Sequence, residues 1–113
     1  MEAAFGKRLD RVRQASPLVH CISNLVTAND CANIVLAAGA SPIMADAPEE
    51  VREITALSRA LCLSLGTPNP RKADAMFLAG RKAAELGLPV VFDPVGAVSY
   101  THLRAHATVL DLV

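Results

Sequence analysis

The sequence predicts an α/β fold with a partial parallel sheet and helices on both of its faces. Three observations lead to this prediction. Short apolar runs alternate with amphipathic helical segments in the order β-α-β-α-β-α-β. The connections between them are short and carry residues that start or end helices. Hydrophobic residues make up 52% of the 113 residues, which is enough to form the core of one small domain. Strands joined in this way by helices form parallel sheets with right-handed crossovers.

Charge and cysteine usage narrow the class of protein. Lys+Arg and Asp+Glu are equal at 11 each, so no net basic field would attract nucleic acid or an anionic membrane, and we expect neither partner. The three cysteines have unrelated spacings and form no CxxC pair, which favours a reducing compartment. The first residues lack the apolar core of a signal peptide, and no apolar run approaches the roughly 20 residues that span a bilayer. We therefore expect a cytoplasmic protein.

The first half of the chain is predicted to contain two helices and two strands. Residues 2–14 have the pattern of an amphipathic surface helix, and residues 18–22 that of a short strand. The next helix begins after Thr27 as its N-cap and stops at Gly39. Residues 41–44 form a second strand. The apolar side chains predicted to give the second helix a broad buried face are Ala28, Cys31, Ala32, Val35 and Leu36.

The second half repeats the alternation. A helix is predicted to start within residues 47–50, followed by a strand at 60–65. A longer helix begins at Asn69-Pro70, Gly87 ends it, and residues 90–92 form a fourth strand. The remaining segment, 97–113, is compatible with one more helix or with a poorly anchored tail. The predicted inner stripes are Val51, Ile54 and Ser58 on the third helix, and Ala73, Met76, Phe77, Gly80 and Ala84 on the fourth.

Candidate site residues stand where these strands end. Ligands of open α/β sheets bind outside the carboxyl ends of the strands. Asp93 could hold a magnesium ion or orient a phosphate there, or it could cap a turn. Asn24 could donate to and accept from a polar ligand, or be a turn residue. Met44 could pack on a flat aromatic ligand or belong to the core. Gly66-Thr67 could present backbone N–H groups to an anion, although no complete phosphate-loop motif is present and a plain tight turn is the alternative.

Metal and thiol chemistry have little support in the sequence. His20 with Cys21, and His102 with His106 at helical spacing, do not supply four convergent zinc ligands. Nothing places a base and an orienting group around a particular cysteine. We therefore expect neither a zinc site nor a cysteine nucleophile.

Three stretches carry a resemblance to a known family. They are PLVHCISNLVTANDCANIVLAAGASPIMADAPEEV, LSLGTPN and GLPVVFDPVGA, which together span roughly residues 16–97. They resemble the hydroxyethylthiazole kinases of thiamine biosynthesis and salvage. The resemblance implies a ribokinase-like fold. It also implies transfer of the γ-phosphate of ATP to the hydroxyl of 4-methyl-5-(2-hydroxyethyl)thiazole with Mg²⁺, and a homotrimer with active sites between subunits. It would place Asn24 and Met44 in the thiazole pocket, Asp93 beside magnesium, and Gly66 and Thr67 in a neighbouring cofactor-binding loop.

The same resemblance implies a partial enzyme. We expect residues 1–97 to be the N-terminal part of a kinase domain that is truncated, and we hypothesise that residues 98–113 are a non-native tail. The family's Arg-Gly-Asn segment, its magnesium-linked glutamate and its glycine-rich loop with the catalytic cysteine would lie beyond this chain. No catalytic residue is therefore assigned, and we expect the chain alone to be inactive. The alternatives are a non-catalytic small-molecule-binding or assembly module, or another ribokinase-like sugar or vitamin kinase.

Overall fold

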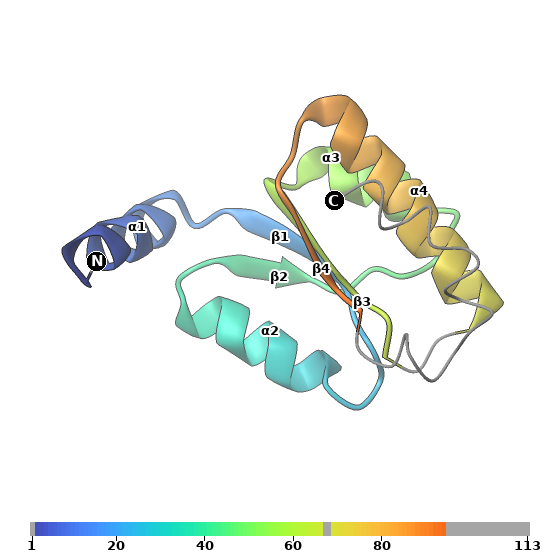
Figure 1. Ribbon diagram of the computed structural model, residues 1–113, viewed down its shortest axis with the longest axis horizontal. Helices are drawn as coiled ribbons and strands as arrows, with labels where there is room; N and C mark the ends of the chain where they lie inside the picture. Colours follow the sequence, from blue (N-terminus) through green and yellow to red (C-terminus); the bar gives the residue numbers. More distant parts are fainter. Residues whose placement is uncertain (1, 67–68, 95–113) are drawn as a thin grey trace.

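A computed structural model of the chain describes residues 2–66 and 69–94. These residues alternate between helix and strand, and Figure 1 shows a parallel sheet with helices packed around it. The α/β prediction is confirmed. In chain order the elements are α1 (Glu2–Ala15), β1 (Leu18–Ile22), α2 (Ala28–Ala37), β2 (Ser41–Ile43), α3 (Val51–Leu57), β3 (Ala60–Ser64), α4 (Pro70–Leu86) and β4 (Val90–Asp93).

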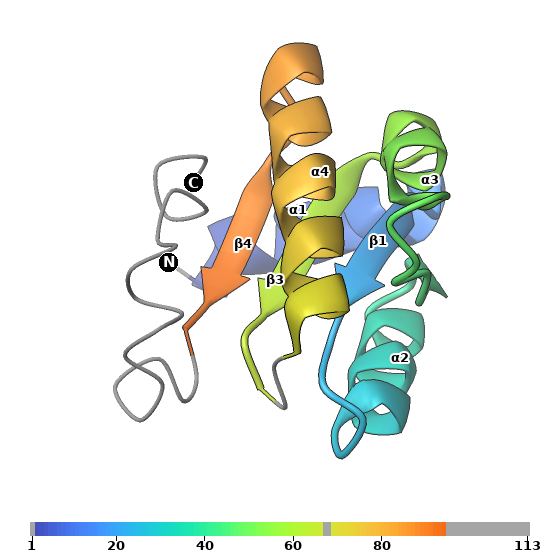
Figure 2. The same cartoon turned by 90° about the vertical axis from the view of Figure 1, so that its right-hand side faces the viewer.

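The sheet has the strand order β2-β1-β3-β4, and each neighbouring pair is parallel. The chain leaves β1 toward one side to form β2, and then crosses to the other side of β1 to form β3. The boundary between β1 and β3 is therefore the topological switch point, where ligands of open α/β sheets bind. Helix α2 lies on one face of the sheet and helices α3 and α4 lie on the other (Figures 1 and 2). Helices on both faces are thus confirmed.

The core lies between the sheet and helices α3 and α4. Successive side chains of a strand point to opposite faces, so Leu61 and Leu63 of β3 point together toward α4, and both are buried. Val90 and Phe92 of β4 pack against the same core. Its fully buried apolar members are Ile22, Val51, Leu61, Leu63, Ala75, Met76, Ala79 and Ala83.

The predicted inner stripe of α4 is partly wrong. Met76 and Gly80 are buried as predicted, but Ala84 is exposed and Phe77 is only half-buried. Three alanines spaced four residues apart take the inner positions instead, because their small side chains let the helix approach the sheet closely. The buried residues of α4 are Lys72, Ala75, Met76, Ala79, Gly80 and Ala83. In α3, Val51 and Ser58 are buried as predicted, while Thr55 rather than Ile54 is the other buried residue.

The predicted inner face of α2 is oriented as expected but is only half-buried. Ala28, Cys31, Ala32 and Val35 are half-buried, Leu36 is 56% exposed, and no residue of α2 is fully buried. Ile34, outside the predicted face, is 70% exposed. The helix contacts β2, but no described segment covers its outer apolar side. On α1, Phe5 is 68% exposed, so that helix lies on the surface as predicted without burying its aromatic side chain. A sequence pattern identifies apolar faces but does not show which of them are covered.

The residues at helix ends follow the sequence signals in α4 and less closely elsewhere. The Asn69 side chain accepts a 2.8 Å hydrogen bond from the Lys72 backbone N–H, and Gly87 ends α4 in the left-handed conformation, as predicted. Thr27 precedes α2 but makes no side-chain cap bond. Helix α3 starts at Val51, since residues 48–50 form a turn. No helix in the described ranges is long and apolar enough to cross a membrane. The predicted boundary at residue 97 and the tail 98–113 lie outside those ranges.

Candidate functional site at the sheet's switch point

The loops that follow β1 and β3 touch each other at the switch point. Asn24 follows β1 and Gly66 follows β3. A Cβ atom at Gly66 would lie 2.4 Å from Nδ2 of Asn24 and 2.8 Å from its Cβ, so a residue with a side chain does not fit there without displacing Asn24. The structure thus brings two of the predicted site residues into contact. Thr67, predicted to act with Gly66, lies outside the described residues.

Asn24 supports its own turn as well as facing Gly66. It is 9% exposed, and its Oδ1 accepts a 2.9 Å hydrogen bond from the backbone N–H of Thr27. This bond closes a turn ahead of α2, whose N-cap residue Thr27 makes no side-chain cap bond. The amide nitrogen lies on the other side of the group, against Gly66. The oxygen of Asn24 thus stabilises a turn, and its ligand-binding role stays a prediction.

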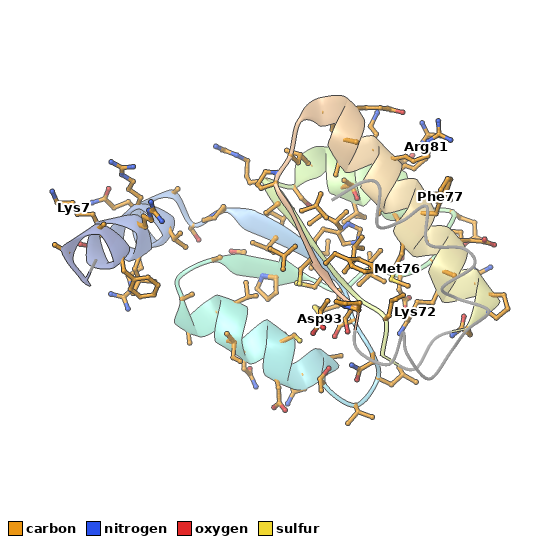
Figure 3. All side chains as sticks on the ribbon, in the orientation of Figure 1. Lys7, Lys72, Met76, Phe77, Arg81 and Asp93 are labelled. Carbon is orange, nitrogen blue, oxygen red and sulfur yellow. The ribbon has the colours of Figure 1, made fainter. Side chains whose placement is uncertain are left out.

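Lys72 is a residue of this site that the sequence did not reveal. It lies in the first turn of α4, is 4% exposed, and its Nζ donates a 2.6 Å hydrogen bond to the backbone oxygen of Ser23 (labelled in Figure 3). Lysine is rarely buried unless paired, so a pattern of apolar positions passes over it. The bond joins α4 to the residue before Asn24. Lys72 therefore places a buried positive charge beside the contact between the two loops.

The His20 side chain connects β1 to α3 and to the backbone that follows β2. Its ring is fully buried between β1 and α3. Nε2 donates a 2.7 Å hydrogen bond to the carbonyl of Ala45, so in the neutral ring Nδ1 accepts from the Thr55 hydroxyl at 2.9 Å. Burial lowers the pKa of His20, while the Ala45 carbonyl and the charge of Glu50 partly oppose the shift. The neutral ring thus holds the backbone next to Met44 in place.

The buried His20 predicts an acid-sensitive fold. Because its folded-state pKa lies below 6.5, the unfolded chain binds the proton more readily, and stability should fall as the pH drops below about 6.5. Urea unfolding midpoints measured from about pH 7.5 to 5.5 should decrease, and the unfolding free energy should fall by up to about 1.4 kcal/mol per pH unit for one proton. The His20→Gln variant should flatten this dependence. Should the midpoint stay constant or rise as the pH falls, or the His20 ring titrate above 6.5 by NMR, the assignment is wrong.

Met44 and Asp93 stand at the two ends of the same sheet edge. Met44 follows β2 and is half-buried, whereas Asp93 ends β4 and is exposed. The backbone oxygen of Asp93 accepts a 3.0 Å hydrogen bond from Leu65 N–H, which keeps the end of β4 beside β3. Since neighbouring strands are about 4.8 Å apart, Met44 and Asp93 are separated by roughly 14 Å of sheet edge, with Asn24 and Gly66 between them.

A pocket of about 260 Å³ lies elsewhere, between α3 and α4, and none of the predicted site residues lines it. Within residues 2–66 and 69–94, no group of three or more His, Cys, Asp and Glu side chains could hold a metal ion. The residues that line the pocket are Arg52, Phe77, Leu78, Arg81, Lys82 and Glu85.

The fold is that of an α/β protein with an open parallel sheet. In such proteins the ligand site is expected at the carboxyl ends of the strands, where the loops after β1 and β3 touch. Comparison with known proteins gives the family: residues 9–113 match the hydroxyethylthiazole kinase family, and the chain belongs to it. It is 59% identical over 93 residues to a hydroxyethylthiazole kinase of Desulfovibrio desulfuricans, covering 82% of this chain and 33% of the relative. It is 50% identical over 106 residues to that of Ruminiclostridium cellulolyticum, covering 93% and 39%.

A solved structure supports the same assignment. The structure described as a hydroxyethylthiazole kinase protein from Pyrococcus horikoshii superposes with a TM-score of 0.88 and 42% identity, over 94% of this chain and 42% of that one. The chain thus spans about a third of the length of these curated relatives, and rather more of the Pyrococcus chain.

Proposed function

We propose that this chain supplies the thiazole-binding wall of an ATP-dependent kinase that phosphorylates the hydroxyl of 4-methyl-5-(2-hydroxyethyl)thiazole. The single observation that supports this most directly is the contact between Asn24 and Gly66 at the switch point, in a chain that is 59% identical to a protein named hydroxyethylthiazole kinase. The contact gives a rigid, partly polar surface where an α/β sheet binds its ligand.

The order of residues along the sheet edge suggests how the substrate would lie. The thioether of Met44 would pack on the flat thiazole ring, and the amide of Asn24 would hydrogen-bond to a polar atom of it. Asp93 lies two strands beyond Asn24, roughly 10 Å away along the edge. In this proposal the ring lies over β2 and β1, and the hydroxyl that accepts the phosphate points toward β3 and β4, with Gly66 and Thr67 in the loop between.

Asp93 fits a limited role in holding magnesium. Mg²⁺ in kinases is held by one or two carboxylates together with waters and substrate phosphates, so a complete protein cage is unnecessary. The carboxylate of Asp93 is exposed at the end of β4, where an ion could reach it. When bound, the ion would neutralise phosphate charge. The chain's own contribution would be to hold one carboxylate at a defined place on the sheet edge.

The chain alone is expected to show no turnover. Phosphoryl transfer requires positioning of both substrates and neutralisation of charge on the transferred group. The described residues offer the thiazole wall and Asp93, but no phosphate loop was found in the sequence. ADP formation in the presence of ATP, Mg²⁺ and the thiazole should equal the background without protein. Turnover that follows the purified chain through a second chromatographic step would contradict this prediction.

A chimera tests the proposed wall directly. Residues 1–94 of this chain would replace the matching segment of the Desulfovibrio desulfuricans relative, and the hybrid should phosphorylate the thiazole. Asn24→Ala and Met44→Ala should each raise the KM for the thiazole about tenfold or more, with the KM for ATP nearly unchanged. Asp74→Ala, at an exposed position on α4, is the matched control. Equal effects on both substrates would argue for a structural role alone.

The proposal also includes the oligomeric state and the cellular compartment of the whole protein. We propose that the whole protein forms a homotrimer in the cytoplasm. The apolar side chains exposed on α2 and in the loop before it support an assembly that covers this face, since Leu25, Val26 and Ile34 are 82%, 79% and 70% exposed. The three free cysteines support a reducing compartment. Sedimentation of the chimera as a monomer would contradict the trimer.

A further inference from the structure

The three cysteines, unrelated in sequence spacing, come together on the α2 side of the sheet. Cys21 of β1 and Cys62 of β3 are register partners on adjacent parallel strands. His20 points toward α3 and Leu61 lies in the core, so the strand alternation turns Cys21 and Cys62 to the opposite face. The Cys21 thiol donates a 3.9 Å hydrogen bond to the backbone oxygen of Val19, and its interaction with the Cys62 thiol shifts the pKa of both groups. Cys31 on α2 also faces this region, 3.5 Å from the Ser23 hydroxyl.

We propose that Cys21 and Cys62 form a two-thiol site for oxidation by peroxides, in which the Cys62 sulfur attacks and Cys21 resolves the product as a Cys21–Cys62 disulfide. The separation of neighbouring strands, about 4.8 Å, lies within the 4.4–6.8 Å between Cα atoms that disulfides require. Both cysteines are free in the structure. The proposal concerns the chain itself and does not depend on kinase activity.

The two sulfurs differ in a way that assigns their roles. Cys21 is 3% exposed, whereas Cys62 is half-buried and can meet a small oxidant. Interaction with the Cys21 thiol lowers the pKa of Cys62 to about 7, against opposing effects of burial and of the nearby Asp93 charge. The same interaction, burial and the charges of Cys62 and Cys31 raise the pKa of Cys21. Cys62 is therefore the thiolate near neutral pH, and thiolates rather than thiols react with peroxide.

The chemistry balances in two steps. The Cys62 thiolate attacks one peroxide oxygen, the O–O bond breaks, and hydroxide leaves and is protonated to water. The sulfenic acid formed on Cys62 is then attacked by the Cys21 sulfur, the S–S bond forms, the S–O bond breaks, and the second oxygen leaves as water with the Cys21 proton. Two thiols and one peroxide give one disulfide and two waters. A reducing thiol restores the pair by exchange.

Peptide mapping tests the pairing in the whole 113-residue chain. After one equivalent of hydrogen peroxide at pH 7, the remaining thiols are blocked with iodoacetamide and the chain is digested with trypsin and with a protease that cleaves before aspartate. Cutting before Asp30 separates Cys21 from Cys31, which share a tryptic peptide. The expected product is a disulfide between the Cys21 and Cys62 peptides that disappears on reduction. On a non-reducing gel the oxidised protein should run as a single chain, which shows that the disulfide is intramolecular. A disulfide to Cys31, a disulfide between chains, or unmodified Cys21 and Cys62 would each overturn the proposal.

Matched alanine variants separate the two roles. In Cys21→Ala the Cys62 sulfenic acid should persist and be trapped by dimedone, and alkylation of Cys62 at pH 7 should slow about tenfold, since an ordinary thiol is only a few per cent ionised there. Cys21→Ser, which keeps a hydrogen-bond donor, should restore most of the alkylation rate without allowing a disulfide. Cys31→Ala should form the Cys21–Cys62 disulfide as the unaltered chain does. Loss of that disulfide in Cys31→Ala would refute the assignment of Cys21 as the resolving thiol.

Discussion

The Leu63→Ala variant is expected to lose about 2–5 kcal/mol of unfolding free energy, as buried leucines do when a cavity replaces them. Leu63 of β3 is fully buried in the core cluster formed by the sheet, α3 and α4. Domains of this size have only about 5–15 kcal/mol in total. The described part of the chain also leaves one sheet face with exposed apolar groups, such as Val91 at 65%. We therefore expect the variant to be largely unfolded under mild conditions.

Urea unfolding followed by far-UV circular dichroism measures this loss. With a dependence of about 1–3 kcal/mol per molar urea, the midpoint should drop by about 1 M or more, or no folded baseline should remain. The Leu57→Ala variant makes the same chemical change at a position that is 71% exposed, and it should stay within about 0.5 kcal/mol of the unaltered chain. Comparable losses in both variants would mean that the core is not where the structure places it.

The Gly66→Ala variant is expected to break the contact between the two loops at the switch point. Its new Cβ would meet the side chain of Asn24 at 2.4–2.8 Å, so Asn24 must move and release the N–H of Thr27. Overpacking of this kind costs about 1–3 kcal/mol. In NMR spectra the Asn24 side-chain amide and the Thr27 backbone amide should shift or broaden. In the chimera, thiazole affinity should fall with them, because the proposed wall is displaced.

Two further variants make this prediction specific. At Gly6 in α1 an added Cβ meets nothing within 4 Å, so Gly6→Ala should leave both amide signals in place. Replacing Asn24 with glycine removes the obstructing atoms, so the double variant Asn24→Gly, Gly66→Ala should be more stable than the two single losses added together predict. Strict additivity of the two losses would show that these residues do not touch.

Local sequence signals accounted for much of the fold. The strand at residues 18–22 and the start and end of α4 were predicted within a residue, because Asn69-Pro70 and Gly87 set the backbone conformation by themselves. The ends of the strands were also recognisable from the sequence, because polar or turn-forming residues follow each apolar run. The structure confirms the predicted positions at the carboxyl ends of strands of Asn24, Met44, Gly66 and Asp93. Their roles toward a ligand stay predictions.

Errors arose where burial depends on distant parts of the chain. The apolar residues predicted to give α2 a broad buried face are only half-buried, and Leu36 among them is exposed. In α4, Ala75, Ala79 and Ala83 are buried against the sheet. Phe77 is only half-buried, and the Arg81 guanidinium lies 5.6 Å from the centre of its ring. Periodicity identifies the apolar face of a helix, but the rotation of the helix about its axis stays uncertain by about one residue. In α4 the buried residue of the first turn is therefore Lys72 rather than the predicted Ala73.

By itself, the sequence determined the order of helices and strands, the parallel α/β class and the resemblance to a kinase family, because these follow from local backbone preferences and from linked motifs. Tertiary structure decided which side chains meet. The strand order β2-β1-β3-β4 places Asn24 against Gly66, the Lys72 ammonium on the Ser23 carbonyl, and Cys21 beside Cys62. Strand order and register are set by the burial of apolar faces across the whole sheet, and the spacing of residues along the chain does not encode them.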